Sequence, residues 1–91
     1  MDIKLTKALS MIKKAEGVRS AKVVGSYITK PQVANDIDIL VEADSDSLNV
    51  GELLDICENN GYECYVVPAS IYTKLPPTRD LNNKPIHIIV Y

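Results

Sequence analysis

The sequence predicts a small α/β (α+β) fold in which helices cover one face of a mixed β-sheet. Two segments, residues 2–16 and 49–59, carry apolar residues at helical spacing. Two others, Asp36–Val41 and Lys84–Tyr91, alternate apolar residues with a period of two. The predicted order is helix, strand, strand, helix, strand, strand. A length of 91 residues with 46% hydrophobic content indicates a single domain, residues 1–91, with a modest core.

Both predicted helices have an apolar stripe and a recognisable end. The first begins at Asp2 and continues to Glu16, where Gly17 is a natural stop. Its stripe consists of Leu5, Ala8, Leu9, Ile12 and Ala15. The second helix follows Asn49, which with Glu52 three residues later resembles a capping box. One stripe on each helix predicts that both pack on the same sheet face.

Four strands are expected, and the connections between them differ greatly in length. The loop Ser26–Asn35 has room for one helical turn before Pro31. The connection Pro68–Asn83 is long for so small a domain, and such connections are often functional. Lys74 and Arg79 within it could reach a substrate, although solvated surface positions are the safer interpretation. The expected strands are Val18–Val24, Asp36–Val41, Tyr62–Val67 and Lys84–Tyr91.

The candidate functional residues occur in two short motifs. Gly25-Ser26 follows the first strand, and Asp36-Ile-Asp38-Ile begins the second. Side chains at i and i+2 of a strand point to one face, so Asp36 and Asp38 lie roughly 6.5–7 Å apart along it and can share hard cations. A glycine lets the backbone approach a phosphate, and the Ser26 hydroxyl can donate to a phosphate oxygen. We expect both carboxylates to project into an open cleft facing this turn. Metal-binding carboxylates beside a phosphate-binding turn indicate phosphoryl or nucleotidyl transfer.

This pattern resembles the DNA polymerase beta-like nucleotidyltransferase superfamily, and in particular its small stand-alone members, the minimal nucleotidyltransferases. The resemblance implies that Gly25 and Ser26 bind the triphosphate of a nucleoside triphosphate (NTP). It also implies that Asp36 and Asp38 bind Mg²⁺ or Mn²⁺. Many members place a cation in the following loop, where Lys30 is the only one. That role falls to Lys30 by resemblance, but a solvated lysine is the simpler interpretation.

The family also expects a third carboxylate on a later strand, and here the sequence departs from it. In Lys84–Tyr91 the corresponding position is His87, with Ile86, Ile88 and Val90 on the other face. Imidazole is a poor ligand for Mg²⁺ but an acceptable one for Mn²⁺, Zn²⁺ or Co²⁺. His87 could also act as a general base, or simply occupy a vacated ligand position. For His87 to join the site, the fourth strand must lie beside the second.

Composition constrains partners and compartment. A net charge of −2 and a pI near 5.2 do not support tight, sequence-independent binding to nucleic acid. No membrane span or signal-peptide core is predicted. Cys57 and Cys64 do not form a CxxC pair, so two buried thiols in the cytoplasm are favoured. Exposed sheet edges in so small a domain predict a homo-oligomer or a small helical protein partner.

Three functional interpretations follow, and whether the protein is an enzyme stays open. The first is a metal-dependent nucleotidyltransferase that moves NMP from an NTP to a hydroxyl on protein, RNA or a small molecule. The second is a catalytically decayed binding or regulatory subunit of the same fold. By resemblance, such a subunit could be an antitoxin paired with a small helical HEPN protein. The third, weaker interpretation is a purely structural nucleotide-binding module.

Overall fold

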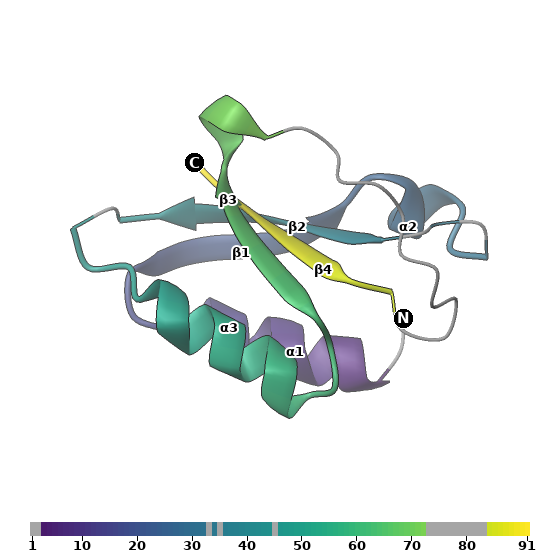
Figure 1. Cartoon of the computed structure of the whole chain (residues 1–91), viewed down its shortest axis with the longest axis horizontal. Helices are drawn as coiled ribbons and strands as arrows, with labels where there is room; N and C mark the ends of the chain where they lie inside the picture. The colour runs from purple at the N-terminus through teal and green to yellow at the C-terminus, as the bar shows by residue number, and fades with distance from the viewer. Residues whose placement is uncertain (1–2, 33, 35, 45, 73–83) are drawn as a thin grey trace.

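The computed structural model describes residues 3–32, 34, 36–44, 46–72 and 84–91. Helices and strands are mixed along the chain, and together they form a small mixed α/β fold with one four-stranded sheet (Figure 1). In chain order the elements are α1 (Ile3–Lys13), β1 (Val18–Val24), α2 (Ser26–Thr29), β2 (Ile37–Ala43), α3 (Val50–Asn59), β3 (Cys64–Pro68), the 3₁₀ turn η1 (Ala69–Ile71) and β4 (Ile86–Val90).

The sheet has the strand order β1-β2-β4-β3. β1 and β2 pair antiparallel, whereas β4 runs parallel to both β2 and β3. β4, the last strand in the chain, is therefore central, and it lies directly beside β2 as the site argument required. In the parallel register Asp38 is paired with His87.

The core lies between the sheet and the two longer helices, which cover the same face (Figure 1). Alternating residues of the central strands point into it, and Ile39 and Ile88 have no exposed surface. α1 buries Leu5, Ala8, Leu9 and Ile12 against this face, and α3 buries Leu53, Ile56 and Cys57. The apolar rows and helical stripes predicted from the sequence therefore meet in one cluster. Fully burying each large aliphatic side chain contributes roughly 1.5–3 kcal/mol.

α1 is shorter than predicted, because it ends at Lys13 instead of continuing to Glu16. Gly17 has a φ of +79°, and the amide of Asp44 donates to its carbonyl oxygen over 2.7 Å. A Cβ at Gly17 would lie 2.5 Å from the Leu48 backbone, so the close approach of the 44–48 loop requires glycine there. The predicted start of α3 after Asn49 is confirmed, since the Asn49 side chain accepts a hydrogen bond from the Glu52 amide over 3.1 Å.

The long connection between β3 and β4 begins with η1 and Tyr72. Lys74 and Arg79, which could reach a substrate, lie outside the described residues. Both cysteines are free; Cys57 is buried and Cys64 is half-buried. In the part of the chain that the structure describes, no helix is long and apolar enough to span a membrane.

Candidate functional site

The candidate site lies on the sheet face that α1 and α3 do not cover. One row of paired residues crosses all four strands on that face: Val24, Asp38, His87 and Tyr65. Asp38, His87 and Tyr65 are each the second residue of their strand. Asp36 directly precedes β2, and because it is two residues before Asp38 it lies on the same sheet face. The site therefore forms where the three mutually parallel strands begin and where β1 ends.

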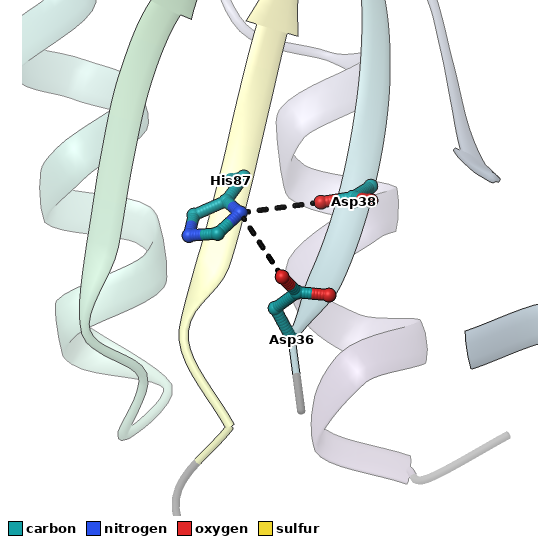
Figure 2. A group of neighbouring side chains, drawn as sticks. All are labelled: Asp36, Asp38 and His87. Carbon is teal, nitrogen blue, oxygen red and sulfur yellow. Dashed lines mark hydrogen bonds and ion pairs between the residues drawn. The ribbon is translucent and has the colours of Figure 1, made fainter. Parts of the chain in front are cut away.

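Figure 2 shows the imidazole of His87 reaching from β4 toward the two carboxylates on the β2 side. Its Nδ1 lies 3.2 Å from Oδ1 of Asp38, within hydrogen-bond distance. The same nitrogen lies 3.6 Å from Oδ2 of Asp36, a distance that allows an ion pair but not a good hydrogen bond. One ring nitrogen thus faces both carboxylates.

The site is more enclosed than the sequence predicted. The exposed fraction of the side chain is 2% for Asp36, 1% for His87 and 13% for Asp38. The prediction that Asp36 and Asp38 project into an open cleft is wrong, because both side chains are largely enclosed. β4 is central in the sheet, and four of its five residues, His87 among them, are buried. A substrate must therefore reach these groups chiefly from the side of Asp38.

Gly25 lies next to the Asp38 side chain. Gly25 follows the last residue of β1, Val24, which is paired with Asp38. Its φ of +80° and ψ of −158° are essentially restricted to glycine. A Cβ added at Gly25 would lie 3.1 Å from Oδ2 of Asp38. Glycine is therefore needed at this position both for the backbone conformation of the turn and for the close approach of the Asp38 carboxylate. Ser26 is the first residue of α2.

Two tyrosines that the sequence argument did not select complete the surroundings of the site. The Tyr72 hydroxyl donates to Oδ1 of Asp38 over 3.2 Å. Burial and the neighbouring Asp38 carboxylate raise the pKa of Tyr72 to about 12. Tyr65 and Tyr72 both lie edge-on to the His87 ring, with centroids 5.8 Å and 6.3 Å away. Tyr65 lies in the predicted strand Tyr62–Val67, so its strand position was a signal that could have pointed to it. No pattern in the sequence indicated that Tyr72 would lie at the site.

Two lysines lie near α2, the short helix that follows Gly25, and their contacts differ. Lys30 caps the end of α2 and is exposed, which agrees with the solvated interpretation. Lys84, just before β4, donates from Nζ to the carbonyl oxygen of Pro31 over 2.6 Å. Its Nζ also lies 5.4 Å from the centre of the Tyr27 ring. Lys84 therefore ties α2 and its loop to the start of β4.

Asp36, Asp38 and His87 lie close enough together to hold a metal ion, since their ligand atoms are all within 4.8 Å of one another. The donor set is two carboxylate oxygens and one imidazole nitrogen, all common protein ligands for divalent metals. The Tyr72 hydroxyl, bonded to one of these carboxylates, restricts its orientation.

No protein-family model, curated protein or solved structure matches this chain.

Proposed function

We propose that the protein is a metal-dependent nucleotidyltransferase that moves NMP from an NTP to a hydroxyl acceptor. The observation that carries the proposal is the position of Asp38 between the glycine turn and His87. Its Oδ2 faces Gly25, and its Oδ1 lies 3.2 Å from His87 Nδ1. A turn suited to phosphate and a potential metal ligand thus meet at one carboxylate.

The proposed roles follow from the donor types. Asp36 and Asp38 hold Mg²⁺ or Mn²⁺, and the Gly25-Ser26 turn binds the triphosphate. The bound metal supplies neutralisation of the triphosphate charge and polarisation of the α-phosphorus. The acceptor oxygen forms a bond to that phosphorus while the bond to the β-phosphate oxygen breaks, releasing pyrophosphate. His87 would either accept the proton of the acceptor hydroxyl or complete the metal ligands, in which case that proton passes to solvent water.

A decayed binding or regulatory subunit is the second candidate, and the His87 contacts favour it. His87 Nδ1 lies 3.2 Å from Asp38 and 3.6 Å from Asp36, so it can partner both carboxylates in the place that a metal ion would otherwise take. Such a subunit would act through a bound nucleotide or a protein partner, for example as an antitoxin beside a HEPN protein. A homo-oligomer is compatible with either candidate.

NTP binding and label transfer distinguish the two candidates. Calorimetric titration with each NTP, with and without Mg²⁺ or Mn²⁺, should show metal-dependent binding if the first candidate is correct. Transfer from α-³²P-labelled NTP to the protein or to added acceptors measures catalysis. Asp38→Asn should abolish both, whereas Asp55→Asn, which neutralises an exposed carboxylate on α3, should change neither. Metal-independent binding without transfer would favour the decayed subunit.

A further inference from the structure

The nitrogen in the ligand set bears on which metal the site takes. His87 Nδ1 lies 3.2 Å from an Asp38 oxygen and 3.6 Å from an Asp36 oxygen. Bonds of about 2.0–2.2 Å from one ion place neighbouring ligands about 3.0 Å apart in octahedral geometry and about 3.4 Å apart in tetrahedral geometry. The measured separations are close to these values. Nδ1 is therefore positioned as a ligand of the same ion as the carboxylates.

The surroundings of His87 restrict the position of its ring. Its side chain is 1% exposed, and its strand position is fixed by the parallel pairing with Asp38. The rings of Tyr65 and Tyr72 pack edge-on against it. The approach of Nδ1 to both carboxylates favours the ring orientation in which this nitrogen faces them. Little ordering entropy remains to be lost when His87 binds a metal.

A buried imidazole ligand changes metal preference in a predictable direction. Mg²⁺ prefers oxygen ligands and keeps several waters, which suits neither a nitrogen donor nor an enclosed site. Affinity of nitrogen-containing sites rises from Mn²⁺ through Co²⁺, and Zn²⁺ also binds imidazole readily. We infer that Asp36, Asp38 and His87 bind one transition-metal ion of the Mn²⁺-to-Zn²⁺ group, through Nδ1 of His87, in preference to Mg²⁺. This inference deepens the proposed function and rests on its assignment of the two aspartates as ligands.

The chain offers an unusually direct test, because it contains a single histidine. In tag-free ¹⁵N-labelled protein without nucleotide, Zn²⁺ should shift the Nδ1 resonance of His87 and leave Nε2 protonated. Calorimetry should show Co²⁺ binding at least about tenfold more tightly than Mg²⁺. His87→Asp should reduce this Co²⁺-to-Mg²⁺ ratio by about tenfold or more, since it replaces nitrogen by oxygen.

Two controls isolate the site. The free thiols Cys57 and Cys64 also bind Co²⁺ and Zn²⁺, so the titrations are repeated on Cys57→Ser/Cys64→Ser protein, which should keep the preference. Asp55→Asn should leave every affinity unchanged, because that carboxylate is exposed on α3. If His87→Asp does not fold, the Co²⁺ and Mg²⁺ affinities and the His87 resonances of the wild-type protein decide the question.

Wild-type protein that binds Mg²⁺ as tightly as Co²⁺, or whose His87 resonances do not respond to Zn²⁺, overturns the inference. These readouts need no nucleotide, so they are independent of the transfer assay. Transfer with Mg²⁺ and an unresponsive His87 would retain the proposed function and refute the metal preference. The inferred preference without NTP binding or transfer would support the metal site and refute the nucleotidyltransferase.

Discussion

Replacing Gly25 by alanine tests whether the glycine turn and the Asp38 carboxylate form one unit. The backbone of Gly25 lies in a region that is essentially restricted to glycine, so alanine should cost about 1–3 kcal/mol of the free energy of unfolding. The new Cβ would also lie 3.1 Å from Oδ2 of Asp38. To relieve this contact, the carboxylate must shift by a few tenths of an ångström. We therefore expect Mn²⁺ affinity to fall by about tenfold or more.

Gly61→Ala is the matched control. Gly61 has a φ of +85°, but a Cβ there would meet nothing within 4 Å. It should therefore cost about 1–2 kcal/mol through backbone strain alone and leave Mn²⁺ affinity unchanged. The chain has no tryptophan, so unfolding is followed by circular dichroism in urea, and Mn²⁺ binding by electron paramagnetic resonance. The reasoning is refuted if folded Gly25→Ala binds Mn²⁺ as the wild type does, or if both variants lose affinity equally.

Three further predictions concern Tyr72, Lys84 and the edges of the sheet. The stabilisation from neutral Tyr72 should be complete below its ordinary pKa near 10 and be lost as pH rises to about 12. Asp38→Asn should lower the pKa of Tyr72 in ultraviolet titration, with Tyr72→Phe as the blank; an unchanged value would contradict the contact. Lys84→Ala should lower the free energy of unfolding by about 1 kcal/mol, and Lys30→Ala by less than about 0.5 kcal/mol. Equal effects would show that the Lys84 contacts contribute nothing. Light scattering should detect self-association, since β1 and β3 form the sheet edges; a strict monomer at high concentration would leave only a heteromeric partner.

Alternation along the strands was enough to place Asp38 and His87 on one face, because a period of two leaves only two orientations. The requirement that β4 lie beside β2 followed from the site argument and is confirmed by the register. Local patterns could not predict the burial of Asp36, since burial depends on what covers the sheet and not on the strand itself. Tyr72 was also out of reach, because it lies in a connection with no periodicity to fix its direction.

The central position of β4 has a consequence for how this protein folds. Among the described residues, β3 joins the sheet only through β4, and β4 is the only parallel neighbour of β2. Asp38 and His87 are 49 residues apart in sequence, so their meeting requires a large loop to close before the contact contributes any stability. A β1–β2 hairpin with α1 can form early from local contacts, but it contains only the two aspartates. We expect pairing of β4 to complete the core and to bring His87 to the two aspartates in the same step. The proposed metal site therefore predicts that Mn²⁺ binding in a stopped-flow refolding experiment coincides with the slowest structural phase and does not precede it.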